Sequence, residues 1–379
     1  MTSKPFSDVI AVEEFQADAA TWLAENHQHA PRDYGAICPP ELVDDGLDWQ
    51  RRMTDAGWAG IHWPVEHGGR GLSIEHHGVW LLECARAGVP AVFNMVGFVL
   101  TGGAILRYGT PDQQHEHLRA TLTTEHVWCQ LFSEPGAGSD LGSLTTRAEL
   151  DGDRYIVNGQ KVWCSGGRYS NYGILMARTR PLDEAPKHDG ISFFLCPMDL
   201  AGIEVRPLRQ MTGEAEFDEV FFTDVELPAD CLLGPSHGGW GVGMAVLTSE
   251  RGHIGTSVIG LERRLDQMAH LADGRDLTAT ERQSLTMLLA RGSAMKAMAQ
   301  RQGPVASTAA SLMKLGITEM MFDVAMLRGD LDGPGATLGG TSATGMLAAP
   351  GGRIAGGSSQ VQRNIIGERL LGLPREPKP

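Results

Sequence analysis

The sequence predicts an α+β fold in which a β-rich segment separates two helical segments. In the first and last parts of the chain, apolar residues recur at spacings of three and four, the period of a helix with one buried face. Between them, over residues 127–232, short runs rich in β-branched and aromatic residues alternate with turn-forming residues. Because 379 residues exceed the usual size of one hydrophobic core, we expect two or three packed units. The changes of pattern along the chain place three domains at residues 1–125, 126–232 and 233–379.

The N-terminal segment is expected to be mostly α-helical, with helices over residues 12–25, 72–107 and 111–120. Phe15, Ala19, Trp22 and Leu23 share one face of the first of these helices. Residues 58–69 are dense in glycine, proline and aromatic residues, so we expect a loop there.

The β-rich segment contains four runs that we expect to form strands, namely Arg154–Val157, Gly173–Ala177, Ile191–Leu195 and Glu219–Phe222. Asn158-Gly159 follows the first run directly. Asn-Gly is the dipeptide most typical of a two-residue hairpin loop, so the sequence predicts a hairpin turn at this point.

The C-terminal segment is expected to be helical over residues 242–270, 278–301, 305–328 and 358–371. It is rich in methionine, which at helical spacing indicates an adaptable apolar core. The glycine-rich stretch 329–357 is expected to be one long irregular loop, and loops of that length are usually functional or mobile.

Composition excludes several classes of protein. The formal charge of −14 argues against nucleic acid or an anionic membrane as the main partner. No run of eighteen apolar residues is present and the N-terminus lacks an apolar signal region, so we expect a cytoplasmic protein without a membrane span. The six cysteines are scattered, which indicates reduced and mostly buried thiols. His115-Glu116-His117 lacks the histidine spacing of a zinc protease, and we expect no metal site.

Two segments of the β-rich region combine features of a ligand site. Residues 130–140 break from an apolar run into Pro135, Gly136 and Gly138, which open the backbone and expose its N–H groups. Residues 161–167 place the indole of Trp163 close to a small hydroxyl. Such a combination suits a large, flat ligand with polar edges. A strand that ends in a glycine turn, without a ligand, explains the first segment equally well.

Five motifs follow one another along the chain: Ser-Glu-Pro-Gly-Ala-Gly-Ser-Asp at 133–140, Asn-Gly-Gln-Lys-Val-Trp at 158–163, Phe-Asp-Glu-Val-Phe-Phe-Thr-Asp-Val at 217–225 with Pro228, Gly-Gly-Trp at 238–240, and Gly-Ser-Ser-Gln-Val-Gln-Arg-Asn at 357–364. Their order and spacing resemble the acyl-CoA dehydrogenase family over nearly the whole chain. The resemblance implies an N-terminal α-helical domain, a middle β-barrel-like domain and a C-terminal four-helix bundle. It also implies FAD as the cofactor and an acyl-CoA thioester as the substrate.

The resemblance further implies which residues contact FAD. They are Gln130, Phe132, Ser133, Gly138, Ser139, Trp163, Cys164, Ser165, Ser358, Ser359 and Gln360. Ser165 matches the position at which the family places a hydroxyl near flavin N5. The implied reaction is α,β-dehydrogenation, in which a base removes the α-proton and the β-hydride passes to N5. Hydrogen-bond donors at the thioester carbonyl would stabilise the developing enolate charge.

The catalytic base is expected to be Glu250. Many family members carry a glutamate just before the Gly-Ser/Thr-Ser/Thr-Gln segment, but this chain has Gly356 there. A second subgroup places its glutamate before an arginine in the helical bundle, which Thr248-Ser249-Glu250-Arg251 matches. The resemblance accordingly places Ser139, Thr248, Arg251 and Gly356 at the substrate. Without the family context, a surface glutamate paired with an arginine would be the simpler interpretation of Glu250.

Part of the family pattern is missing. Homotetrameric members grip the FAD adenosine and pyrophosphate with Arg-x-x-Phe-Gly and Gln-x-x-Gly-Gly-x-Gly segments of a neighbouring subunit. Neither motif is present here, and residues 334–341 stand in the place of the second. This loss resembles the paired subunits of some actinobacterial steroid-degrading dehydrogenases. It implies an oligomer, as the catalytic half of a heterotetramer with a second acyl-CoA dehydrogenase-like subunit.

The family resemblance leaves the electron acceptor open. An electron-transferring flavoprotein is expected as the acceptor, while an oxidase of the same fold would use O2 instead. A partner subunit that keeps the fold but does not catalyse the reaction is a further alternative. The complete motif at 133–140 and the presence of Glu250 argue against it. A steroid side chain or another bulky acyl group is an expectation of subgroup resemblance alone.

Overall fold

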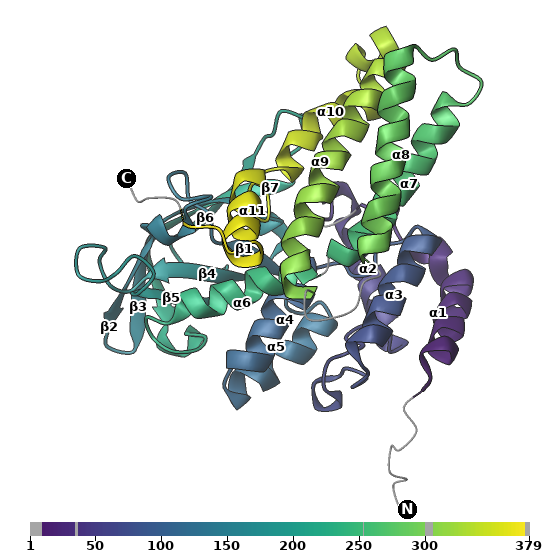
Figure 1. Ribbon diagram of the computed structural model, residues 1–379. Coiled ribbons are helices and arrows are strands. Elements are labelled where there is room, and N and C mark those ends of the chain that lie inside the picture. Colours follow the sequence, from purple (N-terminus) through teal and green to yellow (C-terminus); the bar gives the residue numbers. More distant parts are fainter. Residues whose placement is uncertain (1–9, 35–36, 253, 300–305, 376–379) are drawn as a thin grey trace, which may run out of the picture. The chain divides into compact units, whose positions relative to one another are not determined.

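The computed structural model of the chain describes residues 10–34, 37–252, 254–299 and 306–375, and the side chains of residues 248–252, 254–257 and 306–309 lie outside that description. The chain forms two compact units. The first comprises Met1–Leu208 and Ala215–Val246, and the second comprises Arg209–Glu214 and Leu247–Pro379. Figure 1 colours the chain along its sequence.

Among the described residues, the first unit begins with five α-helices: α1 (Val12–Asn26), α2 (Val43–Asp55), α3 (Ile74–Ala87), α4 (Gly102–Tyr108) and α5 (Pro111–Leu122). Phe15, Ala19 and Leu23 are buried on one face of α1, as expected from their spacing, whereas Trp22 is only partly buried. They pack into a core rich in tryptophan, in which the rings of Trp58 and Trp80 stack with centroids 4.9 Å apart.

The helical region expected over residues 72–107 is interrupted. Ser73 caps the start of α3 by accepting a hydrogen bond from the His76 N–H, and Gly88 ends the helix at φ 74°. Pro90 follows, and helical backbone resumes only with a π-helix at Val96–Thr101. The sequence prediction also missed α2, which has few apolar residues. Its buried face consists of Gly46, Trp49, Gln50 and Met53.

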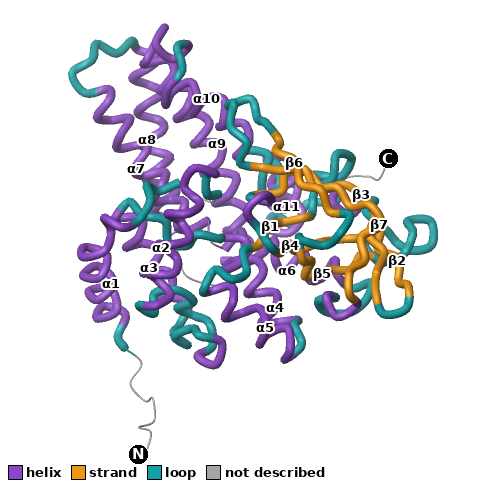
Figure 2. Tube along the Cα trace, turned by 180° about the vertical axis from the view of Figure 1, so that it is seen from behind, coloured by secondary structure: helices purple, strands orange, loops and turns teal. Residues whose placement is uncertain are grey.

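Seven strands form one mixed sheet: β1 (Trp128–Leu131), β2 (Arg147–Asp151), β3 (Arg154–Ser165), β4 (Tyr172–Arg178), β5 (Ile191–Pro197), β6 (Ile203–Leu208) and β7 (Phe217–Pro228). The order is β1-β4-β2-β3-β7-β6, and β5 pairs with β4. Figure 2 shows the strands gathered together, in orange. All four predicted runs lie in strands, and β1 pairs with β4 in parallel while β3 pairs with β7 antiparallel.

The predicted hairpin at Asn158-Gly159 is wrong, because both residues lie inside β3. The register of β3 against β7 shifts between Val157 and Gly159, so the dipeptide marks a β-bulge. A Cβ on Gly159 would lie 2.7 Å from the Thr146 Cα, so the close approach of the chain requires glycine. The Asn158 side chain links β3 to β7, because its Nδ2 donates a hydrogen bond to Asp224 Oδ1 at 3.0 Å.

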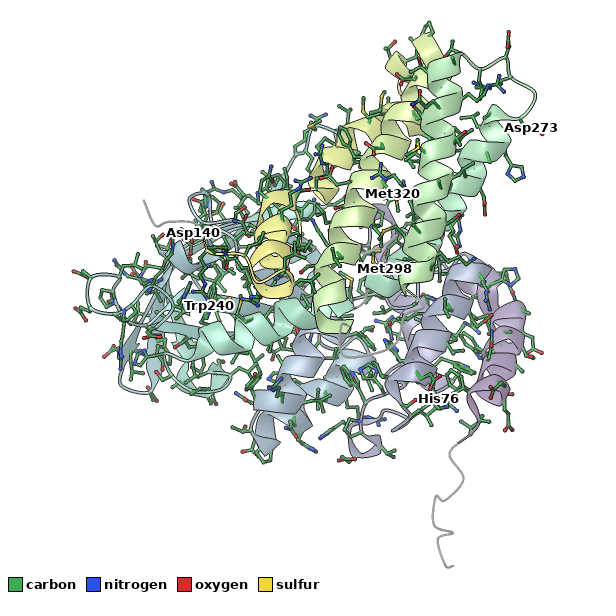
Figure 3. All side chains as sticks on the ribbon, viewed as in Figure 1. His76, Asp140, Trp240, Asp273, Met298 and Met320 are labelled. Atoms are coloured by element: carbon green, nitrogen blue, oxygen red, sulfur yellow. The ribbon has the colours of Figure 1, made fainter. Side chains whose placement is uncertain are left out.

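The remaining helices are α6 (Gly239–Gly252), α7 (Ile254–Ala272), α8 (Ala279–Ala299), α9 (Ala306–Asp332), α10 (Gly340–Gly352) and α11 (Ser359–Ile365). α6 begins in the first unit and ends in the second. The helices predicted over 278–301 and 305–328 correspond to α8 and α9, and that over 358–371 to α11 with a π-helix at Ile366–Leu370. The region predicted over 242–270 corresponds to α6 and α7, on either side of residue 253, which lies outside the described residues. In the second unit, Met298 and Met320 contribute to an apolar core, as expected (Figure 3).

The long irregular loop predicted at 329–357 is also wrong. α9 continues to Asp332, and residues 340–352 form α10. Alanine, leucine and methionine favour a helix there, and packing overrides the glycines. A Cβ on Gly329 of α9 would lie 2.3 Å from the Met346 sulfur of α10, so the glycine lets this side chain pack against α9.

The α+β fold class is confirmed. All six cysteines are free, and all but Cys231, which is partly exposed, are buried. Among the described residues, none of the helices combines the length and apolar character needed to cross a membrane.

Candidate active site

The first segment of the candidate site continues from β1. Glu134 and Ala137 exchange two backbone hydrogen bonds of 3.1 and 3.0 Å, which close a tight turn around Pro135 and Gly136. Gly138 and Ser139 follow in an exposed position, and a Cβ on Gly136 or Gly138 would meet no atom within 4 Å. Within the described residues, the N–H groups of Gly136, Gly138 and Ser139 make no hydrogen bond. The turn thus presents backbone donors outward.

The second segment lies at the end of β3. Pairing with β7 passes from Lys161↔Val220 directly to Cys164↔Asp218, so Val162 and Trp163 form a bulge. Trp163 has φ 62°, a left-handed conformation that is strained for a bulky residue. Its indole is 54% exposed and meets the Phe217 ring edge-on at 5.7 Å. Strained backbone of this kind clusters at functional sites.

The two segments lie side by side, although they are separated in sequence. The Val162 N–H donates to the Ser133 carbonyl at 2.9 Å. Lys161 Nζ donates to the Phe132 carbonyl at 3.0 Å. The exposed indole of Trp163 and the turn around Pro135 and Gly136 therefore lie in one region of the first unit.

The expected site residues in these segments differ in what they can offer a ligand. Ser133 and Ser165 are half-buried, Ser139 is exposed, and none of the three hydroxyls bonds to another described residue. Gln130 is partly exposed in β1. In contrast, the Phe132 ring packs edge-on against Phe193, and the Cys164 thiol lies in the sheet core. Phe132 and Cys164 can therefore meet a ligand only through their backbone.

A buried ion pair supports both segments. Lys161 is fully buried, and its Nζ lies 2.8 Å from Glu134 Oε1. Burial alone would raise the pKa of Glu134, but Lys161 and the donors of Thr145 and Thr146 outweigh it and lower the pKa to about 2. Burial lowers the pKa of Lys161, and Glu134 opposes that shift. The Glu134 carboxylate is therefore ionised at neutral pH.

A second buried carboxylate holds the turn that follows Ser165. Asp218 Oδ2 accepts from the Arg168 N–H at 3.0 Å, and its Oδ1 lies 2.7 Å from Arg168 Nε. Burial raises the pKa of Asp218, against the opposing effect of Arg168. Gly166 enters this turn at φ 65°, where a Cβ would meet the Tyr169 ring.

In the second unit, the expected FAD-contacting residues lie at the start of α11. Ser358 caps this helix by accepting from the Val361 N–H. Ser359 is buried and donates to Glu319 Oε1 at 2.5 Å, while Gln360 is exposed. Gly356 is exposed and has φ 63°.

Two residues of α9, Lys314 and Glu319, bond to the chain before and after the start of α11. Lys314 Nζ donates to the carbonyl groups of Gly352 and Gly357 at 3.2 and 2.8 Å. Glu319 also lies 3.0 Å from Arg353 Nη2 and 3.7 Å from Arg363 Nη2. Burial opposes the effect of these donors on Glu319, but its pKa is lowered.

Thr248, Glu250 and Arg251 fall on α6. Their side chains lie outside the described residues, so the expected base and two of the expected substrate contacts are placed only by their helix.

The sequence did not indicate the residues that support the expected contacts within each unit, which are Lys161, Glu134 and Asp218 in the first unit and Lys314 and Glu319 in the second. Lys161 and Glu134 fell within the motifs, but nothing local indicated that they are paired and buried. A charged residue within a strand run, as Lys161 is in β3, was the available signal.

The comparisons with known proteins agree along the chain. Family models for the acyl-CoA dehydrogenase N-terminal, middle and C-terminal domains match residues 10–125, 129–225 and 237–371. The acyl-CoA dehydrogenase IpdE1 of Mycobacterium tuberculosis is 38% identical, over 97% of this chain and 99% of that protein. IpdE1 of Mycolicibacterium smegmatis is 36% identical, over 98% and 100%.

Solved structures with a similar fold include two-component enzymes. A chain of the Tcur3481-Tcur3483 steroid ACAD has a TM-score of 0.80 at 27% identity and covers 97% of this chain and 100% of its own. A chain of the ChsE4-ChsE5 complex from Mycobacterium tuberculosis has a TM-score of 0.78 at 27% identity, with coverage of 98% and 100%. The resemblance found in the five motifs is thereby confirmed. This chain belongs to the acyl-CoA dehydrogenase family of oxidoreductases.

Proposed function

We propose that this chain catalyses the FAD-dependent α,β-dehydrogenation of an acyl-CoA thioester to the trans-2-enoyl-CoA. The observation that carries the proposal is Trp163, an exposed indole in a strained left-handed backbone beside the Ser133 segment, in a chain of this family. An aromatic face with hydroxyl and backbone donors around it is suited to a flat ring with polar edges.

The residues present fit FAD. The N–H groups of Gly136, Gly138 and Ser139, which bond to no described residue, would meet acceptors of the flavin and its pyrophosphate. The hydroxyls of Ser133 and Ser165 would hydrogen-bond the ring edge, and Trp163 would cover part of a ring face. Gln130 would contribute its side chain, Phe132 and Cys164 their backbone, and Ser358, Ser359 and Gln360 would complete the site. When bound, FAD supplies the acceptor for the β-hydride at its N5 atom.

Glu250 is proposed as the base that removes the α-proton. A carboxylate is suited to this step when a water-poor site raises its pKa toward the working pH. The support is the Thr248-Ser249-Glu250-Arg251 sequence on α6, together with glycine at position 356. We assign substrate contacts to Ser139, Thr248, Arg251 and Gly356. Donors that are already oriented toward the thioester carbonyl would stabilise its negative charge as the α-proton leaves.

The proposed domains are residues 1–125, 126–232 and 233–379. We further propose a bulky acyl group, such as a steroid side chain, because a similar solved structure is named a steroid ACAD. An electron-transferring flavoprotein is the proposed acceptor, and the cytoplasm the proposed compartment.

Anaerobic reduction of the flavin by a panel of acyl-CoAs tests the proposal. We expect at least one acyl-CoA to bleach the flavin of the wild-type enzyme. In Glu250→Gln, FAD remains bound but bleaching slows by at least about 10²-fold, because general-base catalysis contributes about 10² to 10⁴ in rate. Glu262→Gln, on the next helix, is the control and should bleach normally. Bleaching at the wild-type rate in Glu250→Gln would remove Glu250 from the mechanism, and a chain that no acyl-CoA reduces would contradict the proposed function.

A further inference from the structure

The ion pair of Lys161 and Glu134 adjoins both segments of the candidate site, and its burial alone is weak evidence that it stabilises the fold. Lys161 is fully buried and Glu134 is 5% exposed. The Glu134 carboxylate also accepts from the Thr145 N–H, the Thr145 hydroxyl and the Thr146 N–H, at 2.7, 2.8 and 2.9 Å. Because two charges lose their hydration on burial, a well-packed apolar pair is often as stable or more stable. A fully satisfied buried network instead fixes one local arrangement.

The arrangement that this network fixes includes the bulge of β3. Lys161 is the last residue that pairs with β7 before the bulge, and Trp163 is two residues further on. The Lys161 ammonium bonds both Glu134 and the Phe132 carbonyl, so it ties β3 to the end of β1. On the other side of Trp163, the Cys164 side chain is enclosed in the sheet core.

Trp163 needs such anchors. It takes no part in the paired register of β3 and β7, and its ring is more than half exposed. A bulky residue stays in left-handed backbone only where its surroundings fix it. The fixed points on either side of Trp163 are Lys161 and Cys164.

We infer that Lys161 and Glu134 are positioning residues, which hold Trp163 in its left-handed backbone and thereby keep its exposed indole oriented toward the flavin. The inference rests on the proposed function, since FAD is the ligand that the indole would meet. Neither charged group need touch FAD. Their effect on flavin binding passes through Trp163.

A cycle of FAD affinities tests this pathway. Three variants are compared with the wild type. The double variant carries Glu134→Gln and Lys161→Met, so that both charges are removed and neither is left unpaired in the core. The second variant is Trp163→Ala, and the triple variant combines all three changes. We expect the double variant and Trp163→Ala each to weaken FAD binding by about tenfold or more, the size of effect seen when the residues that support a metal site are lost. The triple variant should bind FAD no more weakly than Trp163→Ala. Losses that multiply in the triple variant, or a double variant with wild-type affinity, would overturn the inference.

A second measurement does not depend on flavin. Glycine adopts left-handed backbone without steric cost, whereas alanine does not. In the wild-type background, Trp163→Gly should therefore melt at a higher temperature than Trp163→Ala. In the Glu134→Gln, Lys161→Met background this difference should vanish, because the backbone is no longer held. An equal difference in both backgrounds contradicts the inference. If the wild-type chain binds no FAD even with a second acyl-CoA dehydrogenase-like subunit present, while the melting difference still vanishes, the proposed function fails and the fixation of Trp163 stands.

Discussion

Single residues decide the chemistry of the candidate site through partners that are distant in sequence. Lys161 and Glu134 are 27 residues apart, yet Lys161 Nζ donates a hydrogen bond of 2.8 Å to Glu134 Oε1. A lysine in a strand run is ordinarily solvated, and only the folded neighbourhood makes it a buried charge. The same holds for Asp218 and Arg168, which are 50 residues apart.

A pair of histidines in the first unit predicts a pH dependence of stability. Burial lowers the pKa of His117 and of His126 from 6.5 to about 4, and His117 adds to the shift of His126, while Glu116 and Glu125 oppose it. Between pH 6.5 and about pH 4, these two histidines therefore bind protons in the unfolded chain but not in the folded chain. We therefore expect the free energy of unfolding to fall as the pH is lowered from 6.5 to about 4, and this contribution to level off below that.

Thermal melts across this pH range measure the effect, with two variants for comparison. His126→Phe keeps an aromatic ring against Tyr172, whose ring centroid lies 4.2 Å away, and should flatten the profile. His115→Asn alters an exposed residue of the same helix region and should leave the profile unchanged. A profile that is equally steep in His126→Phe would contradict the assignment.

At the scale of an element, the bulge in β3 depends on one glycine. Gly159→Ala would place a Cβ 2.4 Å from Thr146 Oγ1 and 2.7 Å from its Cα, at φ 154°. Neither the backbone nor the short threonine side chain can yield easily, so we expect a loss of about 1–3 kcal/mol in the free energy of unfolding. Urea denaturation measures it. The control is Gly136→Ala, where a Cβ meets nothing within 4 Å, and an equal loss there would show that the close approach is not the cause.

The start of α11 depends in the same way on α9. In Glu319→Gln the carboxylate that bonds Ser359 and faces Arg353 and Arg363 is lost. We expect about 1–3 kcal/mol less stability, because these are hydrogen bonds to a charged group. Faster amide hydrogen exchange over residues 353–363 reports the loss locally.

Asp323→Asn provides the matched control on the same helix. Its ion pair with Arg291 is 42–43% exposed, so its removal should change stability by less than about 1 kcal/mol. Exchange over residues 353–363 that is unchanged in Glu319→Gln, or equally accelerated in both variants, would remove Glu319 as the support of this segment.

At the scale of the whole molecule, the missing adenosine-binding motifs predict dependence on a second chain. Expressed alone, this chain should purify with less than one FAD per chain. Co-expression with a second acyl-CoA dehydrogenase-like subunit should raise the FAD content, because a ligand is held more tightly when both halves of its site are present. The absorbance ratio of flavin to protein after size-exclusion chromatography measures this. A homo-oligomer saturated with FAD would contradict the heteromeric proposal.

Much of the architecture could be predicted from the sequence, because it follows from periodicity and from the motifs. The run Ile191–Leu195, rich in aromatic and branched residues, lies in β5, and the described part of the helical pattern predicted over 278–301 corresponds to α8 (Ala279–Ala299). The order of the five motifs indicated the family that the comparisons confirm. These signals are local, and each is complete within a few turns or one strand.

The tertiary structure decided what depends on contacts between distant residues. Asn158-Gly159 has the composition of a turn, but the close approach of Thr146 makes it a bulge in a continuous strand. Residues 340–352 lie in a glycine-rich stretch for which we predicted a loop, but they form a helix whose Met346 packs against Gly329. The sequence named Trp163 as a candidate for the site. Its left-handed backbone and the buried ion pair beside it became visible only where β3 packs against the end of β1. The residues close to Trp163 in sequence indicate neither feature.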